Sequence, residues 1–158
     1  MQTRPANPED AEAVARIYNA GIEERIATFE TRPRRPQEVR SWLDGAYPAV
    51  VVVDDGAVVA FASTSAYSPR DCYSGIAEFS VYTDPKERGR GAGHLAMTEL
   101  IREAERRGFW KLLSKVFVEN APSRRLLRSV GFREVGVHER HARLDGAWRD
   151  VVLVERLL

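Results

Sequence analysis

The sequence predicts a single domain, residues 1–158, with a mixed α/β fold. Helical and strand-like periodicities follow one another in the order β-α-α-β-β-β-α-β-α-β-β. A strand, a helix and a second strand occupy residues 76–118, and this crossover requires at least one parallel strand pair. Short turns between the other strands favour antiparallel pairs. We therefore expect a mixed, mostly antiparallel central sheet flanked by about four helices.

The first half of the chain predicts one short strand and two helices. A strand near Gln2–Pro5 precedes Asn7, a helix-capping residue, and Pro8 is suited to the first helical turn. Apolar residues then recur at helical spacing and predict one buried stripe: Ala11, Val14, Ala15, Tyr18 and Ile22. Residues 23–35 lose this periodicity and gather prolines, so we expect a loop there and a short helix over Glu38–Leu43.

The second half predicts an antiparallel meander followed by two crossovers. The expected strands are Ala49–Val53, Val58–Ala66, Ile76–Thr83, Leu112–Val118, Arg133–Leu144 and Trp148–Leu157. Between them, Met97, Leu100, Ile101 and Ala104 form the apolar face of a helix that Gly108 ends. A short helix is expected over Asn120–Val130, with Gly131 at its C-terminal cap. The last two strands form a hairpin around Asp145-Gly146.

Composition excludes several classes of function. The 24 basic and 23 acidic residues nearly cancel, which disfavours nucleic acid and anionic membranes as partners. The sequence contains no apolar run near the length of a membrane span and no signal-peptide core at its N-terminus. Cys72 is the single cysteine and has no evident activating base, so we expect an unreactive thiol. These features predict a cytoplasmic protein.

A glycine-rich loop is the clearest chemical signal. Residues 88–93 read Arg-Gly-Arg-Gly-Ala-Gly between a strand and a helix, where backbone N–H groups and the helix dipole bind phosphate well. A dinucleotide fingerprint fails because His94 stands where its third glycine belongs. A P-loop fails because Gly93 is not followed by Lys and Ser or Thr.

The spacing Arg-x-x-Gly-x-Gly, formed by Arg88, Gly91 and Gly93, resembles the acetyl-CoA pyrophosphate loop of the GNAT N-acetyltransferases. The predicted order of elements is similar to the GNAT fold as well. The resemblance implies that strands 76–83 and 112–118 splay apart to admit the pantetheine arm, and that acetyl-CoA is the co-substrate. The acetyl-CoA contacts implied in this way are Val81, Tyr82, Thr83, Arg88, Gly89, Arg90, Gly91, Ala92, Gly93 and His94.

Glu78 is the candidate catalytic base. Acetyl transfer to an amine requires the neutral amine, so a proton must be removed at neutral pH. Glu78 stands in a run of strand-forming residues shortly before the glycine loop, and partial burial there favours proton acceptance. The alternative is an ordinary solvent-facing position, since period-two alternation places Glu78 with Ser80 and Tyr82.

Residues 120–132 resemble a second GNAT motif, with Asn120 and Ser123 at matching positions as further cofactor contacts. Asn120 caps the helix, touches the cofactor, or does both. The sequence departs from the motif at Leu127, where many relatives carry a tyrosine or histidine that protonates the departing thiolate. Leucine carries no such proton, so another group or water must supply it, or CoA leaves as the thiolate.

Several segments together are similar to the phosphinothricin N-acetyltransferases, and within them to the arsinothricin-resistance branch. They are residues 17–23, 27–31, 77–82 and 143–151. The resemblance implies a homodimer that acetylates the α-amino group of a glutamate-mimicking antibiotic and so confers resistance. It also implies that Phe29 lines the acceptor pocket and that Arg70 and Tyr73 hold the oxygens of an anionic acceptor.

The sequence leaves three alternatives open. The acceptor could instead be methionine sulfone or sulfoximine, or a protein N-terminus, and a non-catalytic acyl-CoA-binding module is the rival outside enzymes. No metal site is expected. His138 and His141 are three apart on a predicted strand, which places them on opposite faces and makes them a poor metal pair.

Overall fold

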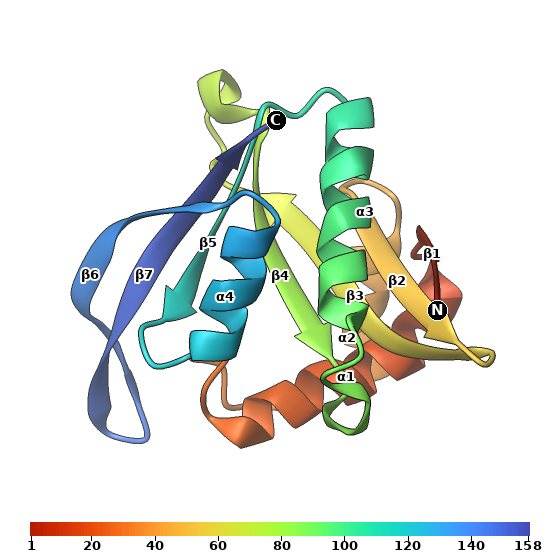
Figure 1. Cartoon of the computed structure of the whole chain (residues 1–158), viewed down its shortest axis with the longest axis horizontal. Helices are drawn as coiled ribbons and strands as arrows, with labels where there is room; N and C mark the ends of the chain where they lie inside the picture. Colours follow the sequence, from red (N-terminus) through yellow and green to blue (C-terminus); the bar gives the residue numbers. More distant parts are fainter.

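The computed structural model describes residues 1–158 and contains one seven-stranded sheet in the order β1-β2-β3-β4-β5-β7-β6 (Figure 1). The strands are β1 Gln2–Pro5, β2 Ala49–Asp54, β3 Ala57–Ala66, β4 Ile76–Thr83, β5 Lys111–Phe117, β6 Arg133–Leu144 and β7 Ala147–Leu157. The helices are α1 Ala11–Glu24, α2 Pro36–Val39, α3 Ala92–Arg106 and α4 Ala121–Ser129. The predicted order of elements and the mixed α/β class are confirmed.

The local signals explain where the helices begin. The Asn7 side chain accepts a hydrogen bond from the N–H of Glu9 at 3.0 Å, and the Asp10 carboxylate accepts one from the N–H of Asn7 at 2.9 Å. This capping box starts a short 3₁₀ turn, Pro8–Asp10, that leads directly into α1. The predicted stripe of α1 is buried throughout.

Only one strand pair is parallel. Ile76, Ala77 and Glu78 of β4 pair with Lys111–Leu113 of β5, whereas all other neighbours are antiparallel. Beyond Glu78 the two strands no longer pair, because β5 follows β7 along its whole length while β4 follows β3. Figure 1 shows β4 and β5 diverging toward the end of β4. The expected splay of these strands is therefore confirmed.

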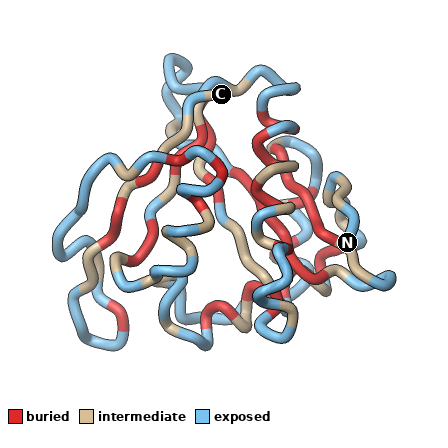
Figure 2. The backbone as a smooth tube through the Cα atoms, viewed as in Figure 1, coloured by how far each residue is buried: buried red, intermediate tan, exposed pale blue.

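The sheet separates two hydrophobic cores. In Figure 2 the buried positions, in red, run along the central strands and recur along the helices beside them. The larger contains 20 buried residues, among them Phe79, Met97 and Leu127, and lies on the face covered by α3 and α4. The smaller contains 11, among them Ile17, Leu43 and Phe61, and lies on the face covered by α1 and α2. No helix combines the length and apolarity that crossing a membrane would need.

The edge strand β6 departs from the predicted regular alternation. Its pairing with β7 shifts register between His138 and Ala142, where Arg140 adopts a left-handed φ of 48° and donates its N–H to Asp150 at 2.8 Å. This bulge turns the following residue back to the same face. The rings of His138 and His141 consequently stack with centroids 4.9 Å apart. The prediction that they lie on opposite faces is wrong because strict alternation does not continue through a bulge.

Candidate active site

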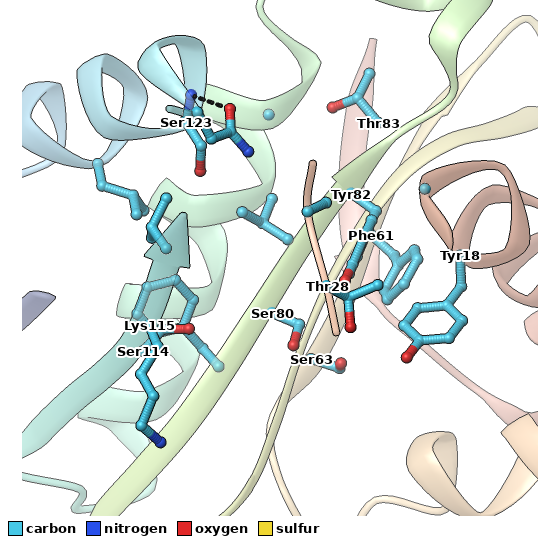
Figure 3. A pocket seen from close by; sticks show the side chains of 18 of the residues that line it. Tyr18, Thr28, Phe61, Ser63, Ser80, Tyr82, Thr83, Ser114, Lys115 and Ser123 are labelled. Carbon is cyan, nitrogen blue, oxygen red and sulfur yellow. Dashed lines mark hydrogen bonds between the residues drawn. The ribbon is translucent and has the colours of Figure 1, made fainter. Parts of the chain in front are cut away.

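A cavity of about 1280 Å³ runs through the gap between β4 and β5. Its wall on one side of the sheet includes Val81, Val116 and Leu126, and on the other side Tyr18, Phe61 and Lys115. Figure 3 shows the cavity along β4: Ser114, Lys115 and Ser123 lie beyond one edge of this strand, and Tyr18, Thr28 and Phe61 lie beyond the other edge. Because side chains from both faces of the sheet line the cavity, it joins the two faces at the point where the parallel pairing ends.

The glycine loop lies at one end of this cavity and fits an anion. Gly89 and Gly91 have φ values of 77° and 87°, a conformation that glycine adopts without strain. Gly91 is the N-terminal cap residue of α3 and provides no side-chain cap, so N–H groups of the first helical turn remain free. These N–H groups and the helix dipole form an anion site, and Gly91, Ala92, Gly93 and His94 all line the cavity there.

The two arginines of the loop occupy different positions. Arg88 lines the cavity and forms a two-pronged ion pair with Glu24 at the end of α1, at 2.5 and 2.6 Å. Arg90 does not line the cavity and instead binds Asp54, at 2.8 Å, and Glu87. The structure therefore brings Arg88, but not Arg90, to the predicted diphosphate site, because the turn directs successive side chains apart.

Backbone groups of β4 face the gap. The N–H of Asp84 donates to the carbonyl of Val59 at 2.8 Å, which makes this opposed pair a hydrogen-bonded one in the β3–β4 ladder. Hydrogen-bonded pairs alternate with unbonded ones, so the main-chain groups of Val81 and Thr83 point away from β3. They point toward the side that β5 has left. This places the two residues expected to hold the acetyl-pantetheine unit at unpaired backbone positions.

A polar surface covers the α1 face of the sheet beside the gap. Ser63 pairs with Ser80, Ser65 with Glu78 and Phe61 with Tyr82 across the β3–β4 ladder. All six line the cavity. Glu78, Ser80 and Tyr82 therefore share one face, as alternation predicts, but that face borders the cavity.

Two tyrosines close the inner end of this surface. The rings of Tyr18 and Tyr82 meet edge-on with centroids 5.2 Å apart, and Tyr82 stacks on Phe61 at 5.5 Å. Burial raises the pKa of both phenols, and the hydroxyl of Thr28 neighbours both. The two hydroxyls therefore stay protonated and available as hydrogen-bond donors.

Glu78 is half-exposed and has a cationic partner. The Nζ atom of Lys115 donates to its Oε1 atom at 3.1 Å, and both side chains line the cavity. Lys115 lies two residues beyond Leu113, the β5 partner of Glu78, and so points to the same face. The sequence predicted the carboxylate but not the lysine, because the signal lies in the register between two strands.

The segment of residues 25–35 forms the outer wall. Phe29 contacts Phe117 edge-on with centroids 4.7 Å apart, and Asn120 donates from its side chain to the carbonyl of Ile26 at 3.3 Å. Asn120 also accepts from the N–H of Ser123 at 3.2 Å, so it caps α4. Phe29, Asn120 and Ser123 all line the cavity, and their contacts with acceptor or cofactor stay predictions.

Arg70 and Tyr73 lie outside the cavity of this chain. Both are exposed on the loop between β3 and β4, where the guanidinium of Arg70 lies 5.7 Å from the ring centroid of Tyr73. The structure therefore does not bring them to Glu78. Sequence reasoning missed Tyr18, Lys115 and His141, which do line the cavity. No three His, Cys, Asp or Glu side chains gather in a way that would hold a metal ion.

Comparison with known proteins identifies the family. The model of the acetyltransferase (GNAT) family matches residues 14–132. The chain belongs to the GNAT family of acetyltransferases. It is 32% identical over 165 residues to the phosphinothricin N-acetyltransferase of Streptomyces coelicolor, covering 100% of this chain and 96% of that relative. It is 28% identical over 159 residues to the L-methionine sulfoximine/L-methionine sulfone acetyltransferase of Salmonella typhimurium, covering 98% and 93%.

Solved structures agree with this assignment. The ribosomal-protein-alanine N-acetyltransferase of Brucella melitensis superposes with a TM-score of 0.95 at 30% identity and 100% coverage of both chains. The GNAT phosphinothricin acetyltransferase of Sinorhizobium meliloti, in complex with acetyl-CoA, gives 0.91 at 28% identity, with 99% and 88% coverage. The GNAT fold predicted from the sequence is confirmed.

This GNAT protein is an acetyl-CoA-dependent N-acetyltransferase, and its residues suit that co-substrate. The free N–H groups around Gly91 fit a diphosphate, and Arg88 adds a cation at the same end of the cavity. The unpaired backbone of Val81 and Thr83 suits the amide-bearing pantetheine arm. Leu127 belongs to the larger core, and its hydrocarbon side chain has no proton to offer the thiolate.

Proposed function

We propose that this chain transfers the acetyl group of acetyl-CoA to the α-amino group of a small amino-acid-like acceptor of the phosphinothricin or arsinothricin type, and so confers resistance to it. The observation that carries the proposal is the placement of Glu78 beside the β4–β5 gap, in a cavity that residues of the 25–35 segment also line. The names of relatives, including a phosphinothricin N-acetyltransferase that is 32% identical, support the acceptor class.

Transfer takes place directly within a ternary complex. Glu78 accepts a proton from the acceptor ammonium, directly or through water, and leaves a nucleophilic amine. The amine attacks the thioester carbonyl, whose developing negative charge is suited to backbone N–H donors at Val81 and Thr83. The carbon–sulfur bond then breaks, CoA leaves as the thiolate, and the nitrogen loses its second proton to water as the amide forms. Solvent returns that proton to the thiolate, because the hydrocarbon side chain of Leu127 has none to give.

The position of residues 25–35 along the cavity favours a small acceptor over a peptide. Phe29 packs on Phe117 and holds the middle of this segment. Asn19 exchanges two hydrogen bonds with the backbone of Arg34, at 2.8 and 2.9 Å, and holds its C-terminal end. Methionine sulfoximine or sulfone is the second candidate acceptor, because a relative named for that activity is 28% identical over nearly the whole chain. A protein N-terminus is the third candidate.

The same proposal includes a cytoplasmic homodimer. Three large apolar side chains on the β6–β7 hairpin are between 41% and 55% exposed: Val135, Val137 and Trp148. A second copy packed on this hairpin would cover them. Sedimentation velocity at micromolar concentration measures the mass of the particle, and a monomer there would refute the dimer.

A comparison of candidate acceptors, each assayed separately, tests the function. Purified protein is incubated with acetyl-CoA and phosphinothricin, arsinothricin, methionine sulfoximine or a short peptide, and release of the CoA thiol is followed. Turnover is expected with the amino acids and not with the peptide. Turnover of the peptide and of none of the amino acids would show that the acceptor is a peptide N-terminus and not a free amino acid. Acetyl-CoA binding without turnover of any acceptor would favour the non-catalytic module.

A further inference from the structure

The ion pair between Glu78 and Lys115 lies on the wall where an acceptor must bind. Their side chains are 39% and 40% exposed, their charged atoms are 3.1 Å apart, and both line the cavity. They project from neighbouring strands at the place where parallel pairing ends. A half-exposed pair of this kind contributes little to stability, so its geometry is easily exchanged for another.

Lys115 has no substitute on this part of the wall. The cavity is lined by five carboxylates, Glu24, Glu30, Asp44, Glu78 and Glu87, but by only two Lys or Arg side chains, Arg88 and Lys115. Arg88 belongs to the glycine loop and binds Glu24. Arg34 lies behind this wall, 6.0 Å from the ring centroid of Tyr18, and is paired with Glu30 at 2.9 Å. Lys115 is therefore the one permanent cation that lines the cavity outside the cofactor loop.

We propose that the Glu78–Lys115 pair receives the zwitterion of an α-amino acid, with Glu78 binding the ammonium and Lys115 binding the α-carboxylate. Both charges of such an acceptor are attached to one carbon, which suits two opposite charges set side by side. Binding replaces one internal ion pair with two pairs between protein and acceptor. This inference rests on the proposed function and deepens it, because it makes Lys115 a residue that selects free α-amino acids.

The neighbouring histidines leave this role to Lys115. His141 lines the cavity, and burial, then His138 and Lys115, lower the pKa of its imidazole. It is therefore neutral at pH 7 and adds no second cation. Two charged residues of β7 lie nearby but do not line the cavity. The carboxylate of Asp150 accepts a hydrogen bond from the N–H of Arg140. The guanidinium of Arg149 lies over the ring of Phe117, 5.6 Å from its centroid.

The arrangement predicts discrimination against acceptors without a free α-carboxylate. A peptide N-terminus or an amino-acid amide presents an ammonium to Glu78 but leaves Lys115 with no anionic partner. A charge-assisted hydrogen bond to an ion changes affinity by about tenfold or more. The free acid is therefore expected to bind better than its amide by at least that factor.

The test compares Lys115→Met with the wild type on two matched acceptors, phosphinothricin and its α-carboxamide. The variant is expected to lower the ratio of kcat/KM for acid over amide by about tenfold or more, mainly through KM for the acid. An unchanged Kd for acetyl-CoA, measured by calorimetry, shows that the variant is folded. Any effect of the lost ion pair on Glu78 acts on both acceptors and cancels in the ratio. Comparing ratios between proteins cancels the different basicities of the two amines.

Lys111→Met is the matched control, because Lys111 lies on the same strand, pairs with Glu155 at 3.6 Å and does not line the cavity. It should keep the wild-type ratio. An unchanged ratio in Lys115→Met would overturn this inference while leaving the proposed function intact. A wild type that acetylates only peptides would overturn both.

Discussion

The guanidinium of Arg88 grips the carboxylate of Glu24 with two hydrogen bonds, at 2.5 and 2.6 Å. This contact joins the glycine loop to the last residue of α1, 64 positions earlier in the chain. Both side chains line the cavity, so the diphosphate of acetyl-CoA and Glu24 compete for one cation. The contact therefore holds the loop in place before the co-substrate arrives.

Replacement of Arg88 by Met should weaken acetyl-CoA binding. Loss of a charge-assisted contact to phosphate is expected to raise Kd by about tenfold or more, as measured by isothermal titration calorimetry. Arg102→Met is the control, since Arg102 is exposed on α3 and pairs only with Glu99. Glu24→Gln should have the opposite effect: it should lower the Kd for acetyl-CoA at low salt, because Arg88 loses its ion-pair partner and is free to bind the diphosphate. Equal Kd values for Arg88→Met and Arg102→Met would exclude Arg88 from the diphosphate site.

Two glycines allow strain to be separated from cofactor binding. Gly91 and Gly45 have φ values of 87° and 89°, and an added Cβ would meet no atom within 4 Å at either. Alanine at each position is expected to lower the free energy of unfolding by about 1 kcal/mol, because both residues adopt the left-handed backbone conformation. Only Gly91→Ala should also weaken acetyl-CoA binding. Urea denaturation and calorimetry test the pair, and equal cofactor affinity in both variants would contradict the assignment of the loop.

Glu78→Gln should remove turnover and keep cofactor affinity. Loss of a general base typically costs about 10²–10⁴-fold in rate, and the deficit should grow toward low pH, where more of the amine is protonated. Glu12→Gln, at an exposed position on α1, is the control. Steady-state kinetics from about pH 6 to 9, roughly the range in which amines begin to lose their proton, measures the effect. Wild-type kcat/KM in Glu78→Gln would require another base.

Phe29→Ala should loosen the outer wall of the acceptor site. The edge contact of Phe29 with Phe117 and the half-burial of its ring predict a loss of about 1–2 kcal/mol in unfolding free energy. KM for the acceptor should rise more than Kd for acetyl-CoA, since residues 25–35 cover the acceptor side. Phe29→Leu should recover most of the stability. A parallel loss of both affinities would place Phe29 in a general structural role.

Asp10 should make stability depend on pH in acid. Burial alone would raise the pKa of this carboxyl, but two hydrogen bonds from Arg4, both at 2.8 Å, and one from the N–H of Asn7 bring it below its ordinary value. As pH falls below about 4, the Asp10 carboxyl is therefore protonated in the unfolded state before it is protonated in the folded state. The free energy of unfolding decreases over this range, until the carboxyl of the folded protein is protonated too.

Asp10→Asn reports this contribution. Above pH 5, taken as roughly one unit above the unfolded value, the variant should be less stable than wild type by about 1–2 kcal/mol. The difference should shrink as pH falls through the lowered pKa of Asp10. Urea denaturation at a series of pH values measures it. A gap that stays constant down to strong acid would show that the carboxylate charge is not what stabilises this contact.

The order of elements and the glycine loop could be predicted from the sequence because both depend on local patterns. Helical spacing on α1 and turn residues at Asp145-Gly146 are properties of short segments. The partnership of Lys115 with Glu78 depends instead on register between strands that are far apart in sequence. No local pattern in β5 distinguishes that lysine from an exposed charge.

Other differences between the sequence-based expectations and the structure have similar physical causes. The stacking of His138 on His141 results from a bulge in β6, which alternation does not predict. Arg70 and Tyr73 lie outside the cavity of this chain, and a loop carries no periodicity from which their orientation could be predicted. Their role in holding an acceptor, which the resemblance implies, stays a prediction. Arg90 looked equivalent to Arg88, yet a left-handed glycine on each side of it turns its side chain toward Asp54.

The division of the interior by the sheet affects how this protein can diversify. Residues that serve the donor lie mainly with α3 and α4, whereas those expected to meet the acceptor lie with α1 and residues 25–35. The two groups pack in different cores and meet mainly at the Arg88–Glu24 and Asn120–Ile26 contacts. Substitutions that reshape the second group away from these contacts leave the core of the first unchanged. A lineage can thus acquire a new acceptor by changes on one side of the molecule while inheriting its acyl donor unaltered.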